Sequence, residues 1–94
     1  MKEKFSVGDI VKSIAGRDKD VKFLVIEVEN ERVLVVDGKT RKIKSPKKKN
    51  KKHLSLVLSV AEKELAEKIQ SGKPTGNEKV YRAIKSQLEN KQED

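Results

Sequence analysis

The chain has 94 residues, enough for one domain and a small appendage, and its lack of cysteine excludes disulfides and thiolate metal sites. Charged residues make up 40% and hydrophobic residues 34%, but the apolar residues cluster, so we expect a small folded core with highly charged ends. The N-terminal sequence lacks the apolar stretch of a signal peptide, and no run approaches the roughly 20 apolar residues of a membrane span. We therefore expect a cytoplasmic monomer without membrane contact.

Residues 1–58 carry the pattern of a small β domain. Short runs of β-branched and alternating apolar residues predict five strands, with Phe23, Val25 and Val33 in the core. The five predicted strands are 10–14, 23–28, 33–36, 40–45 and 53–58. Five short strands joined by tight turns fit a small barrel, which leaves little exposed strand edge.

Turn residues define the connections between these strands. A short polar turn at 29–31 predicts a hairpin between the second and third strands. Asp37-Gly38 predicts a type I′ turn into the fourth strand, because both central positions of that turn need positive φ. Pro46 cannot donate to a strand ladder and is expected to end that strand. The lysines that follow Pro46 are therefore predicted to lie in a loop.

Residues 59–94 change to helical periodicity and are predicted to form a C-terminal extension of two short helices. Ser59 with Glu62 matches a capping box for the first helix, whose apolar face is Leu65, Ala66 and Ile69. Asn77 can cap the second helix. That helix has an apolar face of Val80, Tyr81, Ile84 and Leu88. Helices this short need a partner, so we expect them to dock on the strands or on each other.

The net charge of +8 is supplied by one segment. Residues 1–38 carry a net charge of −1, residues 39–58 carry +9 without any acid, and residues 59–94 are neutral. A polyphosphate favours focused positive charge, because each neutralised phosphate releases condensed counterions. A solvated loop that aids solubility is the alternative, but it does not explain an acid-free run in a chain that mixes charges elsewhere. The nine candidate RNA-binding residues here are Lys39, Arg41, Lys42, Lys44, Lys47, Lys48, Lys49, Lys51 and Lys52.

A second candidate site lies in the turn at residues 13–20, SIAGRDKD. Gly16 permits positive φ and a close approach of backbone to phosphate, and Arg17 and Lys19 project from the turn. Asp18 can hydrogen-bond the turn backbone. A tight turn with solvated charges explains the same residues, and from composition alone it is the simpler interpretation.

The strings AGRDK and VDGKTRKIKSPKKKN…KHL, within residues 7–55, resemble the KOW motif of ribosomal proteins and elongation factors. This stretch of the chain is similar to KOW-domain RNA-binding proteins related to the archaeal and eukaryotic large-subunit ribosomal protein fourteen-e. This resemblance implies an SH3-like barrel over 1–58 that contacts RNA through the AGRDK turn. Asp20 departs from the motif, which usually has Gly or a basic residue there.

The aromatic residues and the histidine indicate which kind of partner to expect. Single-strand readers stack bases on exposed aromatic side chains. Phe23 is expected in the core and Tyr81 on an apolar helix face, so a folded RNA is favoured. His53 is the only histidine and can contact RNA, although a turn or strand-start role explains it equally well. No catalytic motif, metal-ligand cluster or cofactor motif is present, so we expect no enzyme activity.

The sequence thus predicts a protein that binds structured RNA, and the resemblance implies ribosomal RNA as the partner, in ribosome assembly or translation. Two alternatives remain open at this stage. The domain can be a KOW-type interaction module that docks on ribosomal proteins or RNA polymerase, or a non-specific nucleic-acid binder.

Overall fold

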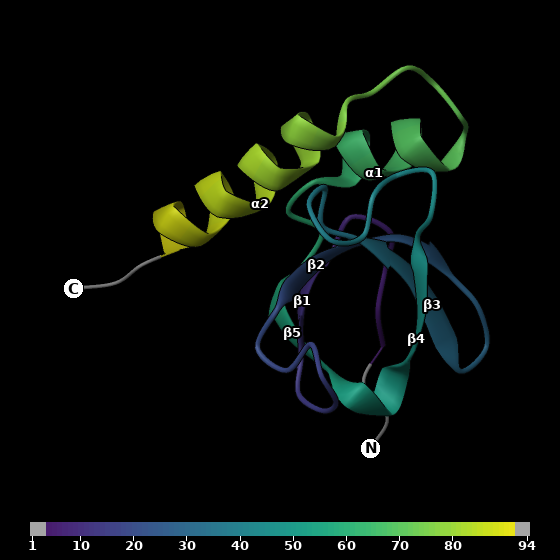
Figure 1. Cartoon of the computed structure of the whole chain (residues 1–94), viewed down its shortest axis with the longest axis vertical. Coiled ribbons are helices and arrows are strands. Elements are labelled where there is room, and N and C mark those ends of the chain that lie inside the picture. Colours follow the sequence, from purple (N-terminus) through teal and green to yellow (C-terminus); the bar gives the residue numbers. More distant parts are fainter. Residues whose placement is uncertain (1–3, 92–94) are drawn as a thin grey trace.

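The structure, a computed structural model, describes residues 4–91 and is mainly β. Five antiparallel strands form one sheet in the order β4-β3-β2-β1-β5 (Figure 1). The strands are β1 (Ile10–Ser13), β2 (Lys22–Val28), β3 (Arg32–Val36), β4 (Lys47–Asn50) and β5 (Leu54–Leu58). A 3-10 turn, η1 (Lys51–His53), joins β4 to β5, and the helices α1 (Lys63–Gln70) and α2 (Asn77–Lys91) follow. The expectation of a five-stranded, mainly β fold with two C-terminal helices is confirmed.

The sheet is strongly bent. Its pairing shifts register between Ile10 and Val11 on β1 and between Val25 and Glu27 on β2, and such bulges bend and twist a sheet. Figure 1 shows the result as a U, with β1 and β5 on one arm and β3 and β4 on the other. No pairing joins the edge strands β4 and β5 within the described residues, so the sheet is not closed and the barrel remains a prediction.

Apolar side chains are buried on both faces of the sheet. One cluster fills the inside of the bend and contains Phe23, Val25 and Val33, as expected from the sequence, together with Phe5, Val11, Val35 and Leu54. A second cluster lies on the opposite face and includes Ile10, Leu24, Ile26 and Val36. Burial on both faces is why β2 and β3 read as nearly continuous apolar runs rather than as strict alternation.

The two helices cover the second face of the sheet. Leu65, Ala66 and Ile69 of α1 and Val80 and Ile84 of α2 are buried in the cluster there, as the helical periodicity indicates. Figure 1 shows both helices at one end of the sheet, with α2 extending sideways beyond it. At 15 residues, α2 is longer than the short helix expected.

The predicted capping box at Ser59 is wrong. Helix α1 begins at Lys63, after Glu62, whose carboxylate accepts a hydrogen bond from Gln87 Nε2 at 2.7 Å. Residue Val60 has φ +48, and its N–H donates to Asp9 Oδ1 at 2.7 Å. This long-range hydrogen bond holds the backbone out of the helical region over the residues that the local motif would make the first turn.

The predicted fourth strand at 40–45 is also wrong. Residues 37–46 form a loop, and the fourth strand is β4, in the lysine run that was expected to be a loop. The Asp37-Gly38 pair does not make a type I′ turn, because only Gly38 has positive φ. Pro46 still marks a boundary, but it precedes the strand instead of ending one.

Candidate nucleic-acid interface

The loop at residues 37–46 has a defined internal structure. Asp37 is buried, and its Oδ1 accepts hydrogen bonds from the backbone N–H groups of Lys39 at 2.9 Å and Arg41 at 2.7 Å. Its Oδ2 accepts from Thr40 Oγ1 at 2.7 Å, and the N–H groups of Asp37 and Gly38 both donate to Arg41 O. One carboxylate thus organises the start of the loop, because it satisfies backbone donors that would otherwise need water.

The same loop is attached to α2. Asn77 Oδ1 accepts a hydrogen bond from the N–H of Ile43 at 2.7 Å, so the side chain expected to cap α2 serves a loop that lies 34 residues away in the sequence. At Gly38 (φ +79), an added Cβ would collide with Asn77 O and lie 2.9 Å from Tyr81 N. Loop and helix are therefore in direct backbone contact, and the loop is held at both ends.

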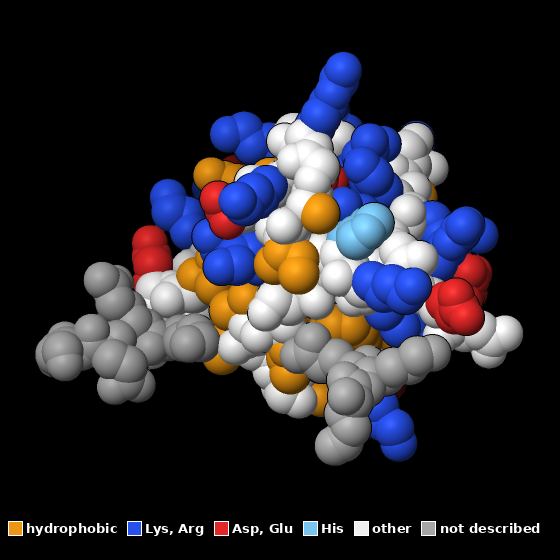
Figure 2. Space-filling model, turned by 90° about the horizontal axis from the view of Figure 1, so that it is seen from below, with side chains coloured by type: hydrophobic (Ala, Val, Ile, Leu, Met, Phe, Trp, Pro, Cys, Tyr) orange, Lys and Arg blue, Asp and Glu red, His pale blue; other side chains and the backbone are white. Residues whose placement is uncertain are grey.

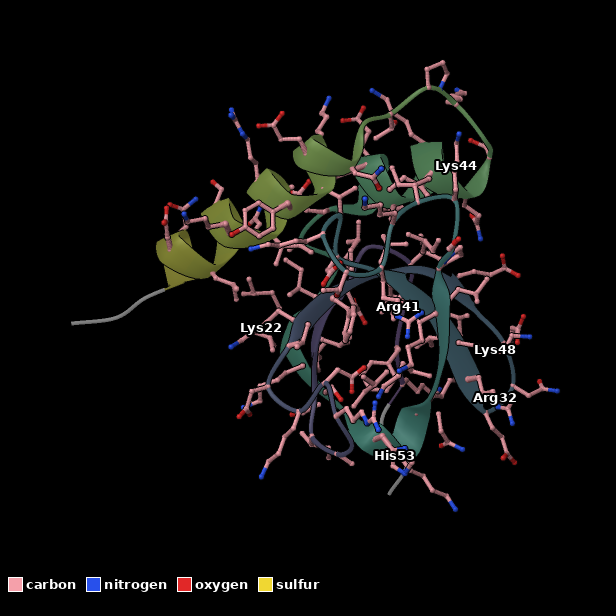
Figure 3. The ribbon with its side chains drawn as sticks, in the orientation of Figure 1. Lys22, Arg32, Arg41, Lys44, Lys48 and His53 are labelled. Carbon is pink, nitrogen blue, oxygen red and sulfur yellow. The ribbon has the colours of Figure 1, made fainter. Side chains whose placement is uncertain are left out.

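Four predicted RNA-binding residues project from this loop. Lys39, Arg41, Lys42 and Lys44 are all exposed, and none of them forms an ion pair within the described residues. Figure 3 shows Arg41 extending over the middle of the bent sheet, whereas Lys44 lies near α1. No carboxylate of the described residues neutralises these four cationic groups, although Lys39 Nζ lies over the ring of Tyr81.

The lysines of β4 differ sharply from one another. Strand pairing sets Lys49 opposite Val33 and Lys47 opposite Val35, so these two face the inside of the bend, whereas Lys48 is paired with Leu34. The Lys49 side chain is only 8% exposed. Lys48 is exposed and lies 3.5 Å from Glu29 Oε1. A lysine side chain can bury its stem against apolar residues when its charged end reaches a partner.

Asp18 is that partner. Its Oδ1 accepts hydrogen bonds from Lys49 Nζ at 3.1 Å and Ser13 Oγ at 3.0 Å, and its Oδ2 accepts from Lys47 Nζ at 3.2 Å. Desolvation by burial raises the pKa of the Asp18 carboxyl, but the hydrogen bonds from Lys49, Lys47 and Ser13 outweigh it and lower the pKa to about 2. Asp18 therefore joins the two predicted sites, the turn and the lysine run, but it also neutralises part of the run.

The turn between β1 and β2 keeps the other expected features. Gly16 has φ +84, and a Cβ there would meet nothing closer than Asp18 Oδ1 at 3.8 Å, so its backbone is open to a ligand. Arg17 and Lys19 are exposed, and neither makes an ion pair within the described residues. Asp20 has φ +75, a conformation that Gly adopts without strain and that Asp tolerates better than most residues.

Lys51, Lys52 and His53 form η1 at the opposite end of the sheet from the helices. Lys51 Nζ donates to Asn30 O at 2.8 Å, whereas Lys52 and the His53 side chain are exposed. Figure 2 shows this end of the molecule, with Lys and Arg side chains around His53 and apolar side chains between them. A groove of about 880 Å³ opens here, lined by Lys4, Phe5, Ser6, Ile14, Asn30, Glu31, Asn50, Lys51, Lys52 and Leu54.

Two further exposed side chains, Arg32 and Tyr81, lie outside the acid-free run and were not among the predicted binding residues. Arg32 begins β3, is exposed and pairs across the strands with Asn50; Figure 3 shows it beside Lys48. The alternation of 32–35 could have placed it on the opposite side from Val33 and Val35. Tyr81 was expected on an apolar face, but it is 40% exposed and Lys39 Nζ lies 5.4 Å from the centre of its ring.

The described residues contain no group of three or more His, Cys, Asp or Glu side chains that could hold a metal ion. Among the same residues, neither helix has the length and apolar character needed to cross a membrane. The polar groups of the site are mainly ammonium and guanidinium ions, which bind anions by charge and hydrogen bonding.

No family model matches the chain, and no curated protein matches it.

Proposed function

We propose that this protein binds RNA, and that its partner is a structured ribosomal RNA contacted during ribosome assembly or translation. The observation that carries the proposal is the 37–46 loop, which presents four exposed cationic side chains from a backbone held by Asp37 and Asn77. Ordering such a loop before binding lowers the entropic cost of contacting a phosphate backbone. The resemblance to KOW-domain proteins supports ribosomal RNA over other nucleic acids.

The binding surface differs from the one expected from charge alone. Its main contacts are assigned to Lys39, Arg41, Lys42 and Lys44, with Arg17, Lys19, Lys48 and Lys52 as further phosphate contacts. Lys49 is buried against Asp18 and is assigned a structural role. Lys47 shares that carboxylate and contributes less to binding than an unpaired lysine.

The test is a salt titration of binding to a folded ribosomal RNA fragment. Changing Arg41, Lys42 and Lys44 together to Gln removes three phosphate contacts and should reduce the slope of log affinity against log salt by roughly two to three units. The matched control changes Lys63, Lys68 and Lys73 to Gln. It removes the same charge from exposed positions near α1 and should leave the slope within about one unit.

Equal slopes for the two triple variants would show that the loop is a solvated surface and would contradict the proposal. The same preparation of protein also tests the two competing functions. Equal affinity for duplex DNA and folded RNA at matched salt indicates a non-specific nucleic-acid binder. Co-sedimentation with ribosomal subunits that persists at high salt and in the loop variant indicates docking on protein instead.

A further inference from the structure

Tyr81 lies where the basic loop meets α2. It is the only tyrosine of the chain, and 40% of it is exposed, whereas its helix neighbours Val80 and Ile84 are buried against the sheet. Lys39 Nζ lies 5.4 Å from the ring centroid, within the range of a cation–π contact. An exposed aromatic ring is thus placed among cationic side chains.

The backbone that carries this ring is held by contacts with the loop. Gly38 packs directly on the first turns of α2, against Asn77 O and Tyr81 N. The Asn77 side chain holds Ile43 of the loop at 2.7 Å. The backbone segments that carry Tyr81 and the loop cations are therefore held against each other, so a ligand that contacts the loop comes close to the ring.

Further charge lies along the same side of the helix. Lys85 is exposed and lies four residues after Tyr81, which puts it one turn away on the same face. Arg82 forms an exposed ion pair with Glu78, in which Arg82 Nη2 lies 2.8 Å from Glu78 Oε2. Lys39, which lies over the ring, and Lys85, one helical turn away, are therefore cations near Tyr81 that can contact phosphates next to a stacked base.

We propose that Tyr81, with Lys39 and Lys85 nearby, is a stacking site for an unpaired base of the bound RNA. The proposal rests on the proposed RNA-binding function and adds that the RNA presents a bulged or looped nucleotide next to a helix. Stacking of a base on an aromatic side chain is worth more than an exposed cation–π contact. A base can thus displace the Lys39 ammonium, which then pairs with an adjacent phosphate.

The test compares two RNA hairpins that differ only in one bulged purine. The wild-type protein should bind the bulged hairpin more tightly. Tyr81→Leu should lose about tenfold in affinity for the bulged hairpin and little for the perfect one, while Tyr81→Phe retains the preference because its ring still stacks. The salt slope should be unchanged in both variants and should fall by about one unit in Lys39→Gln.

The ring itself supplies an independent measurement. Because the chain has one tyrosine, the ring-proton signals of Tyr81 are identified directly by NMR. They should shift upfield on addition of the bulged hairpin and shift little with the perfect hairpin. Thermal melting of Tyr81→Leu should match that of wild type, because the ring is half-exposed.

The outcomes separate this inference from the function on which it rests. Salt-dependent binding of both hairpins with equal affinity, or an equal loss for both in Tyr81→Leu, overturns the stacking site and leaves RNA binding in place. Failure of the wild-type protein to bind either hairpin or the ribosomal fragment overturns both.

Discussion

The ammonium of Lys49 lies 3.1 Å from Asp18 Oδ1, which joins the edge strand β4 to the turn between β1 and β2. These elements belong to the two arms of the bent sheet, and the Lys49 side chain is 8% exposed against 20% for Asp18. Such a pair is costly to break, because Lys49 alone would be a buried charge and Asp18 alone a partly buried one. The contact therefore fixes the distance between the two arms.

Removing one member of this pair should destabilise the fold. Asp18→Asn leaves the Lys49 charge without its partner and should lower the free energy of unfolding by about 3 kcal/mol, measured by urea denaturation at neutral pH. Lys48→Gln is the matched control. The side chains of Lys48 and its partner Glu29 are 48% and 38% exposed, so their contact is worth less than about 0.5 kcal/mol. Equal midpoints for the two variants would show that the Asp18 contact is not structural.

Stability should depend on pH through Asp18. Its pKa is lowered from an ordinary value of 3.8 to about 2 in the folded protein, so the unfolded chain binds the proton more tightly. The stabilisation is complete above about pH 5 and is lost as the pH falls through 2, with a total near 2 kcal/mol. The difference in unfolding free energy between wild type and Asp18→Asn should therefore shrink across this window. A constant difference would mean that the pKa of Asp18 is not lowered.

The two glycines at φ +79 should respond differently to alanine. In Gly72→Ala the new Cβ meets nothing within 4 Å, so the cost is the left-handed backbone alone, about 1 kcal/mol. In Gly38→Ala the Cβ collides with backbone atoms of Asn77 and Tyr81, which cannot rotate away. The cost should exceed that of Gly72→Ala by about 2 kcal/mol or more in chemical denaturation. Similar losses would show that the loop and α2 are not in tight contact.

Asp20 should be replaceable by glycine without loss of stability. Its φ of +75 strains residues with a Cβ, and Gly relieves this while giving the unfolded chain more freedom, so Asp20→Gly should change stability by less than about 1 kcal/mol. Asp20→Ala keeps the strain and loses the polar side chain that tolerates this conformation, so it should be about 1 kcal/mol less stable than Asp20→Gly. Thermal melts of the two variants in parallel test the order. Alanine as the more stable of the two would contradict it.

The sequence predicted the elements that are defined by apolar patterning. Phe23, Val25 and Val33 are core residues, and Leu65, Ala66 and Ile69 mark the buried face of α1. These predictions hold because burial of apolar area depends on local periodicity, which the sequence displays directly.

Features fixed by long-range polar contacts were not predictable in the same way. Lys47, Lys48 and Lys49 are identical letters, so no alternation reveals that two of them face inward toward Asp18, which lies 29 and 31 residues away. The motif at Ser59 is a valid local helix start, but the bond from Val60 to Asp9 overrides it across 51 residues. The division of the lysine run into structural and exposed members therefore needs the fold.

The lysine-rich strand β4 also affects whether the protein associates with other copies of itself. As an edge of the sheet, β4 has backbone groups that another chain could pair with, which is a common route to aggregation. Asp18 offsets part of the charge on Lys47 and Lys49, so the like charge that opposes such pairing comes mainly from Lys48, which faces the other side of the strand. Repulsion at this edge weakens when salt or a polyanion screens it. The conditions that neutralise the chain most fully are therefore those in which it is most prone to aggregate.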